Sequence, residues 1–393
     1  MATPMPKSRN SMKSLIKRAL RPSSQSYFLF GPRGVGKSTW VKGQYPEAMR
    51  IDLLSPDIAR ELLAHPEKLG KLVDARQSDI IIIDEVQKAP AVLTVVHQLI
   101  ESNRNLQFIL TGSNARKLKQ AGADLLGGRA LRCFMHPFTG FELKENFSYS
   151  RALRYGLIPL IWNSDDPETS LDAYIDLYLK EEIQQEGLVR RLDDFARFLE
   201  AISFSHGAVL CVTNIARECE VNRKTVENYI QILDDLLIGY QIPVFSKKAK
   251  RELIKSSKFY FFDTGVFNTL RPRGPLDKPE EIGGASLEGL VAQHLRAWID
   301  YCFPDHMLCF WRTKAKLEVD FIIYGPRVFA AIEVKASRHV THADTRALRE
   351  FKKDYPQARL LMLYGGDDRY VEGDVLILPC ETFLTELQEI MIS

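Results

Sequence analysis

Residues 31–39 read Gly31-Pro32-Arg33-Gly34-Val35-Gly36-Lys37-Ser38-Thr39. This stretch fits the pattern G-x-x-x-x-G-K-[ST], the phosphate-binding loop. The apolar run 27–30 before it predicts a strand, and residues 39–45 after it predict a helix. Glycines let successive backbone N–H groups face one polyphosphate at the positive end of that helix. The stretch therefore predicts an α/β nucleotide-binding domain in which all nine residues contact the nucleotide.

A second motif places two acids at the end of a strand. Residues 80–83 are four isoleucines, and Asp84 and Glu85 follow them. A continuous β-branched run predicts a strand buried on both faces of a parallel sheet, and such sheets bind ligands at the carboxyl ends of their strands. We expect Lys37 to reach the β- and γ-phosphates and Ser38 to bind Mg²⁺, with Asp84 holding the ion through water. Glu85 is the expected general base, and the alternative is that the two acids only cap the strand.

Two later residues are candidates for completing a hydrolytic site. Leu106–Thr111 predicts the next strand, and Asn114 after it is expected to orient the attacking water; otherwise it is a turn residue. Arg129 is a candidate arginine finger that acts within one subunit or on a neighbouring one, so we expect a homo-oligomer. The alternative for Arg129 is an ordinary surface arginine. Arg33 and Arg116 are weaker candidates for the same role.

The order of these motifs resembles a known family. The phosphate loop is followed by Ile-Ile-Ile-Ile-Asp-Glu-Val-Gln-Lys (80–88), Leu-Thr-Gly-Ser-Asn (110–114), Gly-Gly-Arg-Ala (127–130) and His-Pro-Phe-Thr-Gly-Phe-Glu (136–142). This is similar to the prokaryotic AAA-type ATPases that carry a C-terminal domain of unknown function, over nearly the whole chain. The resemblance implies ATP and Mg²⁺ as ligands. The family usually has Pro-Leu-Ser-Phe where this chain has Pro-Phe-Thr-Gly (137–140).

The middle of the chain predicts a helix-turn-helix followed by a wing. Residues 212–218 and 223–237 read as two helices around a turn, and Asn222 is a good N-cap for the second. Two strands, 240–245 and 258–262, follow like the wing of a winged helix. A recognition helix presents polar residues at its N-terminal end to the major groove of DNA.

The candidate DNA contacts are polar or basic residues of the second helix and of the loop between the two strands. They are Arg223, Lys224, Asn228, Lys247, Lys248, Lys250 and Arg251. A basic loop favours contacts with phosphates. The alternative is that this segment packs against another domain or binds a protein.

The last third predicts a β-hairpin with paired acids. Two apolar runs flank residues 325–327, and a turn centred between Pro326 and Arg327 places Asp320 opposite Glu333. Directly opposed side chains have Cβ atoms about 5 Å apart, so the two carboxylates need a cation between them. We expect Asp320 and Glu333 to bind Mg²⁺ and Lys335 to help activate water.

Glu288, on the preceding predicted helix 286–301, is the fourth expected member of this site. The arrangement resembles the PD-(D/E)XK nuclease-like fold, with Val319 where proline often precedes the aspartate. That resemblance implies a Mg²⁺-dependent deoxyribonuclease with Glu288, Asp320, Glu333 and Lys335 as catalytic residues. The alternative is a non-catalytic domain in which Asp320 and Lys335 form a salt bridge.

Composition limits the class of protein. The 393 residues carry a net charge of +3, so the overall charge does not by itself indicate nucleic acid. Six cysteines without a CxxC pair fit a reduced, cytoplasmic protein, and no apolar run reaches the roughly 20 residues that span a bilayer. We expect a basic tail with a short helix (1–25), a P-loop AAA-type domain (26–165), a helical and winged-helix domain (166–270) and a nuclease-like domain (280–393).

The expected function is that of an ATP-binding and ATP-hydrolysing AAA-type protein acting on DNA, with a Mg²⁺-dependent nuclease-like domain. The alternative is an ATP-switched DNA- or protein-binding regulator with an inactive nuclease-like domain.

Overall fold

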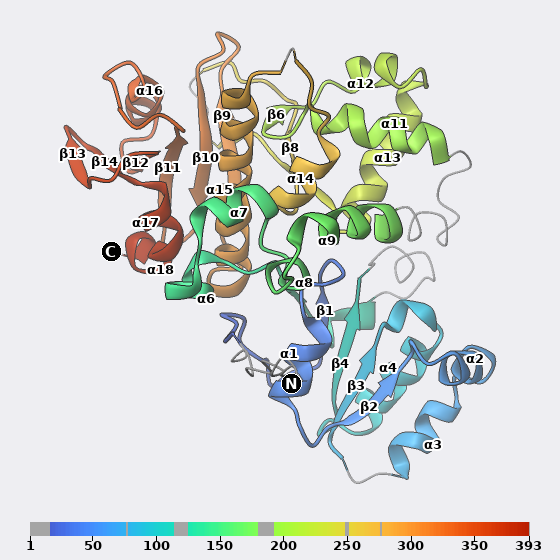
Figure 1. The fold of residues 1–393 in the computed structure, drawn as a ribbon. Coiled ribbons are helices and arrows are strands. Elements are labelled where there is room, and N and C mark those ends of the chain that lie inside the picture. The colour runs from blue at the N-terminus through green and yellow to red at the C-terminus, as the bar shows by residue number, and fades with distance from the viewer. Residues whose placement is uncertain are drawn as a thin grey trace, which may run out of the picture.

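The computed structural model describes residues 16–75, 78–113, 125–179, 192–247, 251–275 and 277–392 (Figure 1). Three sheets organise these residues. The first has five strands, the second three and the third six. They follow one another along the chain, and helices connect and cover them.

The first sheet is parallel throughout and has the order β2-β3-β4-β1-β5. Its strands are β1 (Tyr27–Phe30), β2 (Met49–Asp52), β3 (Ile80–Asp84), β4 (Gln107–Gly112) and β5 (Leu131–Phe134). Helix α1 (Lys37–Gln44) begins inside the phosphate loop, and α4 (Val92–Ser102) connects β3 to β4. The predicted strands are therefore confirmed to within one or two residues at each end.

Two helices differ from expectation near the N-terminus. Residues 56–72, whose sequence pattern favours a single helix, form two helices, α2 (Pro56–Ala64) and α3 (Lys68–Asp74). Pro66 separates them, because proline in a helix interior lacks the N–H donor and disfavours helical backbone before it. The short helix expected within residues 1–25 is absent from their described part, since residues 16–25 are not helical.

The middle part of the chain, residues 140–270, is mainly helical. Short helices α6 (Gly140–Leu143), α7 (Tyr149–Tyr155), α8 (Pro159–Trp162) and α9 (Pro167–Ala173) lead into a π-helix, Tyr174–Leu179. Helix α9 thus continues with a change of pitch, and residues 180–191 after it lie outside the described residues. α11 (Leu192–Ser203) and α14 (Thr264–Leu270) flank the predicted helix pair.

The predicted helix pair and its two strands are present. α12 (Val212–Glu218) turns into α13 (Arg223–Asp235), whose N-cap Asn222 accepts a hydrogen bond of 2.8 Å from the Thr225 N–H. Strands β7 (Gly239–Ile242) and β8 (Lys258–Phe261) pair antiparallel, and β6 (Ala208–Val209) joins the other side of β8. β7 is shorter than the predicted 240–245 because Pro243 ends it.

The last part of the chain, residues 279–392, contains a mixed sheet in the order β13-β14-β12-β11-β10-β9. The strands are β9 (Met307–Arg312), β10 (Glu318–Tyr324), β11 (Phe329–Val334), β12 (Arg359–Tyr364), β13 (Tyr370–Glu372) and β14 (Val375–Pro379). Phe321 pairs with Ile332 and Tyr324 with Phe329, so the predicted hairpin register is confirmed.

The helices of the last part are α15 (Pro279–Cys302), α16 (Arg346–Asp354), α17 (Cys380–Thr385) and α18 (Leu387–Ile392). α15 begins at Pro279 rather than at Ser286, because proline suits the first helical position and Glu280 and Glu281 suit the first turn. The predicted last helix, 382–390, is two helices that meet at Glu386.

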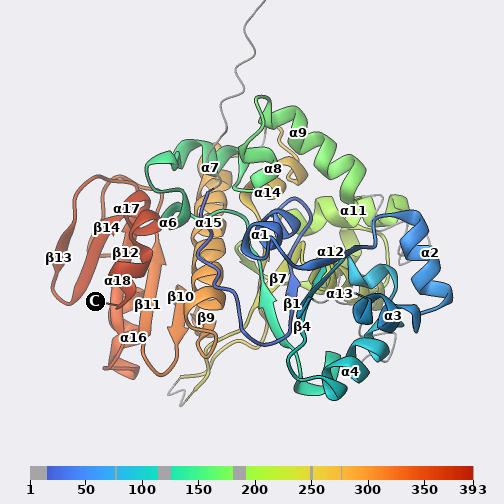
Figure 2. The same ribbon diagram turned by 90° about the horizontal axis from the view of Figure 1, so that it is seen from below.

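α15 lies between the first and last sheets, and both views show it beside β9 and β10 (Figures 1 and 2). One hydrophobic core runs from Leu29 of β1 through Trp298 of α15 to Ile332 of β11. Residues after β7 also enter the last part: the Phe245 N–H donates to the Phe310 carbonyl at 2.7 Å. None of the described helices is long and apolar enough to cross a membrane.

Candidate nucleotide site and acidic cluster

The phosphate loop has the backbone that its glycines predict. Gly34 and Gly36 have φ angles of 79° and 91°, which side chains disfavour. A Cβ on Gly31 would lie 2.4 Å from the Met135 carbonyl, so only glycine fits there. The buried Lys37 ammonium donates to the carbonyls of Gly31 at 2.7 Å and Pro32 at 3.1 Å. Lys37 is therefore folded inside the loop.

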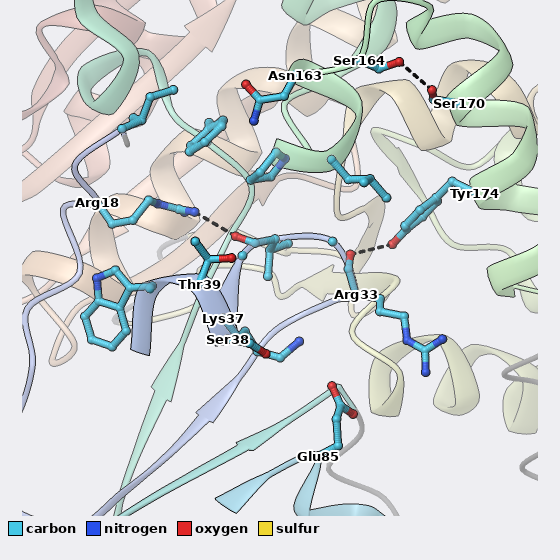
Figure 3. Close-up of a pocket in the computed structure, with 18 of the residues that line it drawn as sticks. Arg18, Arg33, Lys37, Ser38, Thr39, Glu85, Asn163, Ser164, Ser170 and Tyr174 are labelled. Carbon is cyan, nitrogen blue, oxygen red and sulfur yellow. Dashed lines mark hydrogen bonds between the residues drawn. The ribbon is translucent and has the colours of Figure 1, made fainter. Parts of the chain in front are cut away.

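A cavity of about 1390 Å³ opens around this loop (Figure 3). Residues 33–39 and Glu85 line it together with Ile16 and Arg18 of the N-terminal segment and residues of the middle part between 159 and 174. The Tyr174 hydroxyl donates to the Arg33 carbonyl at 3.1 Å. Such a cavity has apolar walls for a base beside backbone donors for phosphates. Gly31 and Pro32 do not line this cavity themselves but hold Lys37 within the loop.

The two acids at the end of β3, Asp84 within it and Glu85 directly after it, face different surroundings. Asp84 accepts a short hydrogen bond from the Thr111 hydroxyl, and that hydroxyl accepts from the Glu85 N–H at 3.1 Å. Glu85 is buried, has a φ of 58° and lines the cavity. Its carboxylate accepts from the Gln87 amide and, at 3.3 Å, from the Ser113 hydroxyl. Backbone strain of this kind is typical of functional sites.

Thr111, Gln87 and Ser113 were not singled out from the sequence. Thr111 and Ser113 lie at the end of the strand next to β3, and neighbouring parallel strands place their carboxyl ends together. That rule alone indicates that polar residues here face Asp84 and Glu85.

The other two predicted hydrolytic residues are Asn114 and Arg129. Asn114 lies outside the described residues. Arg129 forms a short ion pair with Glu101 and is not among the residues that line the cavity. Within one chain Arg129 is therefore away from the phosphate loop, and its action on a neighbouring subunit stays a prediction.

The predicted acidic residues of the last part do come together, around a lysine that the sequence had not indicated. The ammonium of Lys258, from β8, lies 2.9 Å from Glu288, 2.6 Å from Glu318 and 3.2 Å from Asp320. Only 1% of the Lys258 side chain is exposed. Glu288 also accepts from the Tyr260 hydroxyl at 2.5 Å. An internal cation thus occupies the centre of the acidic cluster.

Glu333 and Lys335 lie beside this cluster and form their own ion pair at 3.1 Å. Asp320 accepts from the Val334 N–H at 2.9 Å, as the register requires. The salt bridge given as the alternative, Asp320–Lys335, is not the pairing found, because Asp320 pairs with Lys258 and Lys335 with Glu333. Among the described residues, no three His, Cys, Asp or Glu side chains are arranged to hold a metal ion.

Burial controls the charge of the cluster. Desolvation and the nearby charge of Asp320 raise the pKa of Glu288 and the pKa of Glu333 above the usual range of a glutamate. Three carboxylates around Lys258 exceed its single charge, although Arg312 also contacts Glu318 at 2.9 Å. Burial therefore disfavours the charged forms of Glu288 and Glu333.

The candidate DNA contacts differ in their exposure and in the contacts that they already make within the chain. Arg223, Lys224 and Asn228 are exposed on α13, and Arg223 pairs with Glu227, one turn away. Lys247 lies over the ring of Tyr324 at 4.5 Å.

Arg251 is already engaged within the chain. It forms ion pairs with Glu350 at 2.9 Å and Asp354 at 2.7 Å, both on α16. Lys248 and Lys250 lie outside the described residues. The described C-terminal end of the loop between β7 and β8 therefore binds the last part of the chain, which supports packing rather than DNA contact for Arg251.

The parallel sheet, the phosphate loop and the acids of β3 define an AAA-type ATPase-like domain, and residues 23–144 match the model of an AAA domain. Residues 146–277 and 283–383 match two further models, each described as a domain of unknown function (DUF8612 and DUF4143).

Uncharacterised proteins of Mycobacterium bovis and Mycobacterium tuberculosis are 27% identical over 387 residues, which cover 96% of this chain and 85% of theirs. An uncharacterised protein of Haemophilus influenzae is 23% identical over 214 residues, which cover 50% of this chain and 53% of that protein. A solved structure, replication initiator DnaA bound to AMPPCP and single-stranded DNA, has a TM-score of 0.24 and 14% identity, over 55% of this chain and 83% of that one.

Proposed function

We propose that the chain binds and hydrolyses ATP at residues 31–39, Asp84 and Glu85, and that the nucleotide state controls a DNA-binding surface on α13. The cavity carries this proposal, because its walls come from the phosphate loop on one side and from the middle part on the other. A nucleotide bound there touches both. The same proposal divides the chain into domains at 26–165, 166–270 and 280–393, acting as a homo-oligomer.

The residues around the cavity suit ATP with Mg²⁺. We expect backbone donors of the loop and Lys37 to meet the phosphates and Ser38, which lines the cavity, to hold Mg²⁺, which neutralises phosphate charge when bound. Asp84, at the end of β3, is the second expected ligand, through water, although it does not itself line the cavity. Glu85 reaches the same cavity with a buried carboxylate. Its contacts with Gln87 and Ser113 orient it to accept a proton from water.

DNA contact is tested by charge reversal on α13. In a chain carrying both Arg223→Glu and Lys224→Glu, we expect the ATPase rate without DNA to stay unchanged. The DNA concentration for half-maximal stimulation should rise at least about tenfold, or about 1.4 kcal/mol, because phosphate contacts are lost. The measurement is steady-state ATPase rate against single- and double-stranded DNA at low salt.

The matched control is Arg338→Glu, because Arg338 is also about 70% exposed and pairs with an exposed acid, Asp367. Equal stimulation of the parent chain and the α13 variant would contradict contact through α13. If DNA never changes the ATPase rate of the parent chain, the surface serves another partner.

A second candidate function is Mg²⁺-dependent DNA cleavage by the last part. It is supported by the convergence of Glu288, Asp320 and Glu333 and by the resemblance to the PD-(D/E)XK fold. Lys258 favours the alternative, an inactive nuclease-like domain, because its ammonium already supplies the cation that the carboxylates need. We therefore infer a structural rather than a catalytic cluster.

The two readings of the cluster give different results with plasmid DNA. We expect the parent chain to leave supercoiled plasmid intact in Mg²⁺ and in Mn²⁺. Nicking that disappears in Glu333→Ala while the ATPase rate persists would establish the nuclease instead.

A further inference from the structure

Behind the phosphate loop, the buried guanidinium of Arg18 connects the loop to helix α15. Its Nη1 donates to the Val35 carbonyl at 2.9 Å (Figure 3). Its Nη2 donates to the His136 carbonyl at 2.5 Å and to the Tyr301 hydroxyl at 3.2 Å. Val35 belongs to the phosphate loop and Tyr301 to α15. One side chain therefore contacts both elements.

The charge of Arg18 is satisfied by the protein. Its Nε donates to the Glu142 carboxylate at 3.0 Å, and the exposed fractions of these two side chains are 6% and 1%. Each nitrogen of the guanidinium thus donates to a protein oxygen. Although Arg18 lines the cavity, it is held to support the loop rather than to bind a phosphate.

Two consecutive residues of α15 also hold the segment beneath the loop. The Tyr301 hydroxyl accepts from the His136 N–H at 2.9 Å, and Asp300 lies 2.6 Å from His136 Nε2. The preceding residue, Met135, presents the carbonyl that packs against Gly31. The position of α15 therefore fixes the surface on which the loop rests.

We propose that α15 is a working part of the nucleotide site, with Tyr301 as the positioning residue that orients Arg18 and, through it, the phosphate loop. The inference rests on the proposed function, since it requires ATP to bind at this loop. Its consequence is that nucleotide affinity depends on how the last part of the chain packs. A buried hydrogen-bonded network of this kind couples its members more strongly than isolated pairs do.

The test is Tyr301→Phe in the full-length chain. Loss of the hydroxyl leaves the His136 N–H without its partner and removes one of the acceptors of Arg18 Nη2, which still donates to the carbonyls of His136 and Pro137. A hydrogen bond of ordinary strength corresponds to about tenfold in affinity. We expect the Kd for mant-ATP, measured by fluorescence, to rise by about that factor. The kcat at saturating ATP should stay unchanged, because Tyr301 does not touch the reacting atoms.

Tyr240→Phe is the matched control. Tyr240 is also buried and packs against α15, where Arg296 lies 4.2 Å from its ring, but its hydroxyl has no hydrogen-bond partner in the described part of the chain. We expect this variant to bind mant-ATP like the parent chain.

Arg18→Lys changes the donor of the Arg18–Tyr301 hydrogen bond and keeps a positive charge beside Glu142. If Tyr301 acts through Arg18, the double variant should bind no more weakly than Arg18→Lys alone, whereas independent effects would add. This comparison also stands if Tyr301→Phe by itself lowers stability, because the reference is then Arg18→Lys.

The possible results distinguish a failure of the Tyr301 inference from a failure of ATP binding itself. A parent chain that binds mant-ATP, with a Tyr301→Phe chain that binds it equally well, overturns this inference alone. Additive losses in the double variant also overturn it. A parent chain that does not bind mant-ATP overturns the proposed function and this inference with it.

Discussion

A Glu85→Gln chain is expected to bind ATP as tightly as the parent chain and to hydrolyse it about 10²–10⁴-fold more slowly, the usual contribution of a general base. Glutamine keeps the size of the side chain and its contacts with Gln87 and Ser113 but cannot take a proton from water. The measurements are single-turnover hydrolysis and the Kd for mant-ATP. A loss of kcat with an unchanged Kd would assign Glu85 to the chemical step.

Glu61→Gln is the control for this prediction. Glu61 lies on α2, which covers the same parallel-sheet part of the chain. Its exposed carboxylate pairs with Lys68 at 2.7 Å and does not line the cavity. Its removal should leave the hydrolysis rate unchanged. Retained hydrolysis in Glu85→Gln would mean that another group activates the water, and the assignment of Glu85 would be wrong.

Lys258→Met is expected to lower the free energy of unfolding by about 3–5 kcal/mol, the cost of leaving a buried charge without its partner. The substitution keeps most of the apolar stem but removes the ammonium that Glu288, Glu318 and Asp320 share. Equilibrium unfolding in urea measures the change. Surface lysines give a much smaller effect, about 0–1 kcal/mol.

Lys278→Met provides that comparison, since Lys278 is 74% exposed and pairs with Glu281 at 3.6 Å. A second change tests the cause: Asp320→Asn should restore part of the stability lost in Lys258→Met, because one excess carboxylate is then removed. A Lys258→Met chain as stable as the parent would show that the carboxylates do not depend on the ammonium.

The sequence predicted local structure well wherever one short pattern decides the outcome. The phosphate loop fixes a strand before it and a helix after it, and β1 and α1 lie where that pattern requires. The hairpin register followed from the Gly-Pro turn, because a turn of fixed length leaves one pairing that buries the apolar face.

The contacts between distant parts could not be predicted in this way. Lys258 precedes Asp320 by 62 residues, and a basic residue on a strand carries no sign of which acids will surround it. Arg18 likewise precedes Tyr301 by 283 residues. Residues at strand ends can be inferred from sheet topology, whereas partners across separately folded layers depend on how those layers pack.

The segment around β7 and β8 follows the helix pair in sequence but packs against the last sheet. Phe245 and Lys258 belong to the segment that follows the helix pair, yet Phe245 packs among Phe329, Phe351 and Tyr355, and Lys258 is surrounded by acids of the last part. Separating these regions would expose aromatic surface and strip a buried ion of its partners at once. The segment around β8 and the last sheet are therefore expected to unfold together rather than separately.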